Sequence, residues 1–200
     1  MLKNRFENKE DALNQLLHTI NKDIIKKSVV LTISQKGIFY AKEIGLKNGF
    51  LEGDFLFIEK VLSPVNKETP LAVVSETKDY VIIEEFINSF EITDDYVFSE
   101  INRVFEERIL EDIYQLRAGE GIISIEGRDV LLIDESSNSG LKLLCAIKSC
   151  LSKKVNSINV AVPVISKESA DMIGKLVDNT FFVKIVEDFV SVEHYFKEYK

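Results

Sequence analysis

Two adjacent carboxylates followed by small polar residues form the segment of this 200-residue chain best suited to chemistry. Asp134 and Glu135 come directly after the apolar run Val130–Ile133. The next five residues are all small: Ser136, Ser137, Asn138, Ser139 and Gly140. Small residues allow backbone N–H groups to crowd around an anion, and the start of a helix adds partial positive charge. Paired acids beside such a cradle suit a ligand with hydroxyl groups next to a phosphate, or a bound magnesium ion.

The same residues also have a purely structural interpretation. Serine and asparagine before a helix are ordinary N-caps, and acidic residues in a first turn favour the helix dipole. The residue types alone therefore leave the functional and the structural interpretation open.

Strands and helices alternate along much of the chain, which predicts the frame that positions this segment. The β-branched run Ser28–Ile33 is typical of a strand covered on both faces, and a helical stretch follows it through Ile44. The last third repeats this pattern: strand Asp129–Ile133, helix Gly140–Leu151, strand Ser157–Val162, helix Ser166–Val177 and strand Phe181–Ile185. Strands separated by helices imply a parallel sheet with right-handed crossovers.

The middle of the chain predicts a second, smaller set of elements. A short strand is expected at Asp54–Ile58, and Leu71–Ser75 and Tyr80–Ile83 form an expected antiparallel hairpin. An amphipathic helix is predicted from about Tyr96 to Leu116. We therefore expect one domain over residues 1–200, of the α/β class, with an open, mainly parallel sheet flanked by helices and a small antiparallel hairpin or hood.

Composition narrows the class of protein. No apolar run approaches the roughly 18 to 20 residues that cross a bilayer, and the charged start Met1–Glu7 lacks an apolar signal core, so we expect a cytoplasmic protein without a membrane partner. The net charge of −8 argues against nucleic-acid binding, which depends on neutralising phosphates. Cys145 and Cys150 fall on different faces of one expected helix, which predicts two buried or half-buried thiols and argues against a metal site or a structural disulfide.

The segment Val130-Leu-Leu-Ile-Asp-Glu-Ser-Ser-Asn-Ser-Gly-Leu-Lys142 resembles the motif with which type I phosphoribosyltransferases bind phosphoribosyl pyrophosphate (PRPP). That motif has an apolar strand, two acidic residues and a short loop of small residues ending in Thr-Gly. Further blocks resemble one subgroup, the uncharacterised bacterial phosphoribosyltransferases, in the same order along nearly the whole chain: Phe6–Ala12, Val29–Gly37, Lys60–Glu68, Val160–Pro163 and Phe189–Tyr199.

Both phosphate loops depart from the family pattern. Ser136 replaces a glycine and Ser137-Asn138 replace an apolar-small pair, whereas Ser139-Gly140 keep the hydroxyl and the glycine. In the first loop, Ser34-Gln35-Lys36 replace Pro-Arg-Gly, so an arginine that faces phosphate in the family is missing. Lys36 supplies a point charge there without the bidentate fork of arginine.

The resemblance implies transfer of the phosphoribosyl group from PRPP to an unidentified nitrogenous base, with release of pyrophosphate, as in nucleotide metabolism. It implies that Asp134 and Glu135 bind the ribose hydroxyls as the catalytic pair and help to place Mg²⁺. Residues 136–140 would hold the 5′-phosphate, and the pyrophosphate would contact Gln35, Lys36, Gly37 and Lys60.

The altered loops leave a second function open: a weakened or inactive regulatory protein that binds PRPP or a nucleotide with the same fold. In either case the partners are small molecules. A homodimer is the expected assembly, since dimers are the commonest soluble oligomers. The glycine-punctuated stretch after Leu116 is the expected mobile flap.

Overall fold

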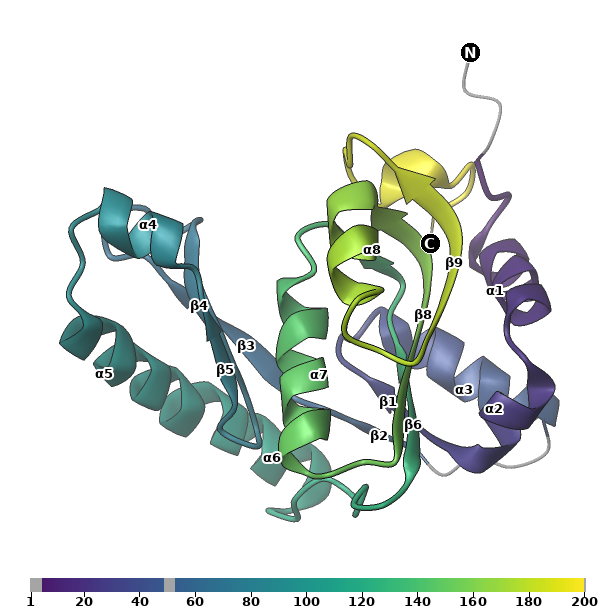
Figure 1. Cartoon of the computed structure of the whole chain (residues 1–200), viewed down its shortest axis with the longest axis horizontal. Coiled ribbons are helices and arrows are strands. Elements are labelled where there is room, and N and C mark those ends of the chain that lie inside the picture. Colours follow the sequence, from purple (N-terminus) through teal and green to yellow (C-terminus); the bar gives the residue numbers. More distant parts are fainter. Residues whose placement is uncertain (1–4, 49–52, 200) are drawn as a thin grey trace.

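A computed structural model describes residues 5–48 and 53–199 and contains a parallel sheet of six strands (Figure 1). Its strands follow the order β2-β1-β6-β8, with β2 at one edge, and both β7 and β9 pair with the long strand β8. Every pairing in this sheet is parallel. The strands are β1 (Ser28–Thr32), β2 (Gly53–Phe55), β6 (Asp129–Ile133), β7 (Ser136–Ser137), β8 (Ser157–Ser166) and β9 (Asn179–Val186). The predicted α/β class with a mainly parallel sheet is confirmed.

Helices cover both faces of this sheet, which explains why its central strands are apolar without interruption. In β6, Val130 and Leu132 pack into one hydrophobic cluster, whereas Leu131 and Ile133 pack into the opposite one. On one face lie α7 (Leu141–Ser152) and α8 (Lys167–Ile173), and on the other lie α1 (Lys9–Thr19), α2 (Lys22–Lys27) and α3 (Gly37–Asn48) (Figure 1).

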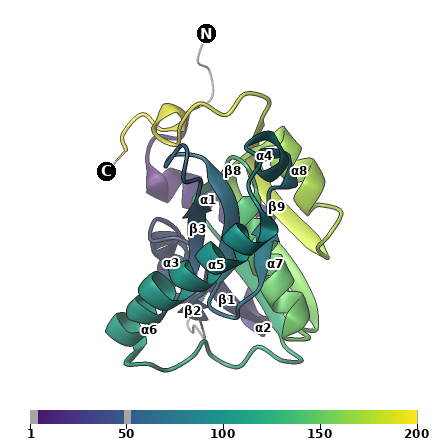
Figure 2. The ribbon, with the colours of Figure 1, turned by 90° about the vertical axis from the view of Figure 1, so that its left-hand side faces the viewer.

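A second sheet of three antiparallel strands stands beside α7, and we call it with its helices, residues 58–117, the hood (Figures 1 and 2). The predicted antiparallel hairpin is confirmed by the pairing of β4 with β5. A separate hydrophobic cluster fills the space between the hood strands and helices. The hood elements are β3 (Ile58–Leu62), β4 (Pro70–Ser75), β5 (Tyr80–Ile82), α4 (Glu84–Ser89), α5 (Asp94–Val104), η1 (Phe105–Ile109) and α6 (Leu110–Arg117).

The prediction of one strand at Asp54–Ile58 is wrong, because this stretch is divided between the two sheets. β2 ends at Phe55 in the main sheet, and β3 begins at Ile58 in the hood. The Leu56 amide still donates to Thr32 of β1 (2.9 Å), whereas the Phe57 carbonyl accepts from the Glu76 amide beyond β4 (2.9 Å). The chain therefore changes its hydrogen-bonding partner between these two residues.

The predicted long helix of the hood runs from Asp94 to Arg117 but contains a π-helical turn, η1. A π turn holds one more residue than an α turn and so rotates everything that follows it. Ile109 is consequently buried, whereas Leu110 is 42% exposed. The hydrophobic stripe shifts by one residue at this turn.

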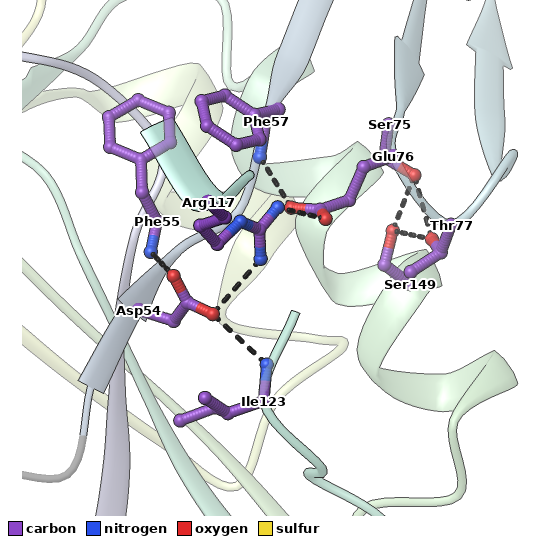
Figure 3. Close-up of polar contacts among 9 residues, drawn as sticks. All are labelled: Asp54, Phe55, Phe57, Ser75, Glu76, Thr77, Arg117, Ile123 and Ser149. Carbon is purple, nitrogen blue, oxygen red and sulfur yellow. Dashed lines mark hydrogen bonds and ion pairs between the residues drawn. The ribbon is translucent and has the colours of Figure 1, made fainter. Parts of the chain in front are cut away.

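An ion-pair cluster joins the hood to the main sheet (Figure 3). The guanidinium of Arg117, at the end of α6, binds the carboxylates of Asp54 in β2 (3.0 Å) and Glu76 after β4, and it lies 4.9 Å from the centre of the Phe57 ring. Asp54 also accepts a hydrogen bond from the Ile123 amide (3.0 Å), which fixes the stretch after the hood. One cation thus connects both sheets and the following segment.

Three smaller features concern the helices. Asn8 caps α1 by accepting from the Asp11 amide (2.9 Å). Cys145 and Cys150 are buried free thiols on α7, and burial raises the pKa of each to about 12. Among the described helices, none combines the length and the apolar character that crossing a bilayer requires.

Candidate functional site

The loop after β1 and the loop after β6 meet at the carboxyl edge of the main sheet, because β1 and β6 are parallel neighbours. Ser34 follows β1 and Asp134 follows β6, 100 residues later, and the Ser34 hydroxyl donates a hydrogen bond to Asp134 Oδ1. The acidic pair and the loop 34–37 are therefore parts of one site.

Gly37 makes this approach sterically feasible. A Cβ atom on Gly37 would lie 2.2 Å from the Thr32 hydroxyl oxygen and 3.3 Å from the Asp134 Cα. The Gly37 amide also donates to Ser34 Oγ (3.0 Å), so the same serine caps the start of α3 and binds the acid. The residue predicted to contact pyrophosphate is thus also needed for the packing of the two loops.

Asp134 lies almost entirely out of solvent, with 8% of its surface exposed. Its Oδ1 atom accepts hydrogen bonds from Ser34 and from the Glu135 amide (2.7 Å). Burial nevertheless raises the pKa of Asp134 to about 6, because a charged carboxylate is costly in a site of low polarity. Perturbed acids of this kind are frequent at functional sites.

Glu135 is covered by residues from both ends of the chain. Only 1% of it is exposed. The Tyr199 hydroxyl donates to Glu135 Oε2 (2.7 Å), and the Lys9 ammonium lies 3.7 Å from Oε1. Sequence reasoning gave neither residue a role, although Tyr199 ends the last block that resembles the family.

Tyr40 of α3 contributes a further buried polar group to this site. It is fully buried, and this burial raises the pKa of its hydroxyl. The nearby Glu135, Tyr199 and Asp134 raise the pKa further, by smaller amounts. Among the described residues, neither the Tyr40 hydroxyl nor Glu135 Oε1 has a hydrogen-bond partner. Buried polar atoms normally have partners, so these two atoms are candidates to meet a ligand.

The loop after Glu135 is held firmly against β8 and α8. Ser136 and Ser137 form β7, and the Asn138 carbonyl accepts hydrogen bonds from two serine hydroxyls at the start of α8 (2.5 Å each). Gly140 has φ of +70°, and a Cβ atom there would lie 2.6 Å from the Met172 side chain of α8. Glycine is therefore required for the backbone conformation and also for the packing.

The N-terminus of α7 offers free amides next to the acidic pair. Gly140 occupies the cap position and no side chain caps the helix. Within residues 5–48 and 53–199, the amides of Ser139 and Gly140 donate no hydrogen bond. Free amides and the helix dipole together attract an anion to this place.

The side chains of the remaining predicted residues, Gln35, Lys36 and Lys60, are exposed. The Lys36 ammonium lies 3.6 Å from the Glu193 carboxylate and 5.1 Å from the Tyr199 ring centre. Lys60 is exposed on β3 opposite Val73, which lies in the hydrophobic cluster shared with α7, so Lys60 leaves the hood on the face toward α7. The roles given to these residues stay predictions.

The usual metal-binding side chains are not clustered in the part of the chain that the structure describes. No group of three or more histidine, cysteine, aspartate or glutamate side chains is placed there to hold an ion. The assignment of Asp134 and Glu135 as indirect magnesium ligands stays a prediction.

No protein-family model and no curated protein matched the sequence. Solved structures, however, match the fold over most of the chain. TT1426 from Thermus thermophilus gives a TM-score of 0.73 at 24% identity, covering 96% of this chain and 90% of that chain. A hypoxanthine phosphoribosyltransferase from Staphylococcus aureus gives 0.51 at 19% identity, covering 94% and 79%. The hypoxanthine-guanine phosphoribosyltransferase of L. donovani gives 0.51 at 12% identity, covering 94% and 85%.

These comparisons show the fold. The parallel sheet with its helices and the small antiparallel sheet together match the architecture of the phosphoribosyltransferases. The predicted fold-level resemblance is confirmed, whereas the subgroup and the roles of the altered loops stay predictions.

Proposed function

We propose that the protein binds PRPP at the carboxyl edge of its main sheet and transfers the phosphoribosyl group to a nitrogen of a base, releasing pyrophosphate. One observation supports this most directly. The buried pair Asp134 and Glu135 lies beside the uncapped N-terminus of α7, in a chain with the phosphoribosyltransferase fold. Acceptors for hydroxyls and donors for a phosphate are therefore adjacent, as phosphorylated ribose requires.

Each part of the donor has a matching group in this proposal. The carboxylates of Asp134 and Glu135 accept hydrogen bonds from the ribose hydroxyls. The amides of Ser139 and Gly140, with the Ser139 hydroxyl, donate to the 5′-phosphate. Lys36 and Lys60 supply positive charge for the pyrophosphate, from the main sheet and from the hood respectively.

In the reaction, the bond between ribose C1 and the pyrophosphate oxygen breaks, and a bond from C1 to the acceptor nitrogen forms. That nitrogen loses its proton to water or to the departing pyrophosphate, which leaves with the bonding electrons. Positive charge develops on the ribose and negative charge on the leaving group, so fixed charges placed on both sides lower the barrier. Magnesium, carried mainly by the pyrophosphate and water, would neutralise the leaving group, and the oxygen atoms of the acidic pair suit such an ion.

Calorimetric titration with PRPP, with and without magnesium, tests this proposal. We expect magnesium-dependent binding that Asp134→Asn weakens by about 1.5–3 kcal/mol, the value of a hydrogen bond to a charged group. Asp95→Asn, an exposed acid in the first turn of α5, is the matched control and should bind like the wild type. Equal binding by the wild type and Asp134→Asn would refute the assignment of the acid.

The phosphate loop is tested separately with Ser139, whose side chain is exposed. Ser139→Asp places a negative charge beside the free amides and should abolish measurable binding of PRPP, whereas Ser139→Ala removes one hydroxyl and should weaken it only slightly. Gly140→Val is a poorer probe, because the added side chain would collide with α8 before any ligand binds. Unchanged affinity of Ser139→Asp would contradict the loop assignment.

The second candidate function is a regulatory protein that binds PRPP without turnover, and it predicts a different result when pyrophosphate release is measured. The missing arginine of the loop 34–37 motivates it. Bases are added to the PRPP-bound protein and pyrophosphate release is measured. Release with any base supports the transferase, whereas binding without release from a broad panel of purine and pyrimidine bases would favour the regulatory protein.

A further inference from the structure

The C-terminal segment covers the carboxylate that the proposed function assigns to the ribose. Glu135 is 1% exposed, and the Tyr199 phenol donates a hydrogen bond of 2.7 Å to its Oε2 atom. An alcohol group of a sugar would donate to a carboxylate in the same way and over the same distance. In the present structure, therefore, one ligand position on Glu135 is already filled by the protein's own hydroxyl.

Tyr199 also contacts two cations of the site, the ammonium groups of Lys9 and Lys36. The Lys9 and Lys36 ammonium groups lie 4.9 Å and 5.1 Å from the centre of its ring, within the range of cation–π attraction. Lys36 is the residue predicted to contact pyrophosphate, and Lys9 lies 3.7 Å from the second oxygen of Glu135. One aromatic side chain thus covers an acid and two cations at once.

The segment that carries Tyr199 is attached in a way that permits release. Phe196 anchors the segment in the core at 2% exposure, and beyond that residue its backbone pairs with Phe6 and Glu7 through the amides of Lys197 (2.8 Å) and Glu198 (2.9 Å). The Lys197 and Glu198 side chains are exposed. Segments held by few, solvent-exposed hydrogen bonds are the ones that open locally.

We propose that Tyr199 is an internal competitor of the ligand, which fills the hydroxyl position on Glu135 and must be displaced before PRPP binds. The inference rests on the proposed function, because it requires that Glu135 receives a ligand hydroxyl. Displacement exposes Glu135 Oε2 and frees Lys36 for the pyrophosphate. It also opens the buried side of the site, where Glu135 Oε1 and the Tyr40 hydroxyl lack hydrogen-bond partners among the described residues.

Calorimetry with PRPP and magnesium on Tyr199→Phe tests the competition. This variant keeps the ring beside the two lysines but removes the hydroxyl, which binds Glu135 and also interacts with the Lys36 ammonium. We expect PRPP to bind about tenfold more tightly than to the wild type, because the closed form loses a hydrogen bond to a charged group. Tyr114→Phe is the matched control, since Tyr114 is 74% exposed on α6, and it should bind like the wild type.

The outcomes separate this inference from the proposed function. If the wild type binds PRPP and Tyr199→Phe binds equally or more weakly, the competition is refuted and the proposed function stands. If neither protein binds PRPP, both are refuted. Binding by Tyr199→Phe alone would support both.

Hydrogen exchange gives a second readout that needs no variant. The amides of Lys197 and Glu198 should exchange faster when the wild-type protein is saturated with PRPP and magnesium, because their partners at Phe6 and Glu7 are lost when the segment leaves. Slower or unchanged exchange on binding would refute displacement, since the segment would then remain closed over the ligand.

Discussion

Replacing Arg117 by methionine should remove the cation that binds Asp54 of the main sheet and Glu76 of the hood. Methionine retains the length and the apolar stem of the side chain and deletes the guanidinium. The carboxylates of Asp54 and Glu76 then stay in place without their partner, at 13% and 2% side-chain exposure. Water cannot readily replace the lost cation at Glu76, because this carboxylate is almost fully enclosed.

The expected size of the effect follows from this burial. Removing one partner of a buried ion pair costs about 3–5 kcal/mol, because the remaining charge is uncompensated. Loss of the contact between Arg117 and the Phe57 ring adds about 0.5–2 kcal/mol. Arg103 is the matched control: it also binds two carboxylates, Glu100 and Glu107, but is 46% exposed. Arg103→Met should therefore leave the free energy of unfolding close to that of the wild type.

Urea unfolding followed by circular dichroism measures both variants. In the wild type, burial raises the pKa of Glu76, and the hydrogen bond from Arg117 opposes this. Without Arg117 the pKa should rise further, so the deficit of Arg117→Met should be smaller at pH 5 than at pH 8. Adding Glu76→Gln should restore part of the lost stability, because an amide needs no counter-charge. A cost no greater than that of Arg103→Met, or no gain from Glu76→Gln, would refute the reasoning.

Two further predictions concern the edge of the main sheet. Gly37→Ala should reduce the free energy of unfolding by about 1–3 kcal/mol, because the added Cβ atom would collide with Thr32. Gly121→Ala should be neutral, because the space around Gly121 is open. Equal unfolding midpoints of the two variants would contradict this prediction. Burial raises the pKa of Asp134 to about 6, so its protonated form stabilises the fold below about pH 4 and this contribution is lost as the pH rises through 6. Between pH 4 and 8 the wild type should lose up to about 3 kcal/mol of stability relative to Asp134→Asn, and a constant difference in urea unfolding would show that Asp134 does not titrate there.

The main sheet could be predicted because its strands have a strong local signal. The run Val130–Ile133 is apolar on both faces, and the structure buries both of them. Features that depend on which parts of the chain pair with each other had no such local signal. Phe55, Leu56 and Phe57 read as one continuous strand, since all three are apolar and only their partners change. The π turn before Leu110 could not be predicted from the sequence either, because one extra residue in a turn leaves the composition of the helix unchanged.

The candidate site was predictable in part. Parallel neighbouring strands end at the same edge, so the loops at Ser34 and Asp134 could be expected to meet. Lys9 and Tyr199 could not be assigned to the acidic pair, because nothing in their local sequence distinguishes them from other surface residues. Their position depends on the pairing of the two ends of the chain at Phe6, which is set by the complete fold.

The separation of 100 residues between Ser34 and Asp134 has a consequence for how the molecule folds. The hood strands β3, β4 and β5 pair with their immediate neighbours along the chain, so only short loops must close to form them. The pairing of β1 with β6 requires the whole intervening segment to be looped out, and long-range parallel pairings form slowly. In refolding, amide protection should therefore arise in the hood before it arises in β1, and the two carboxylates should be the last part of the molecule to leave water.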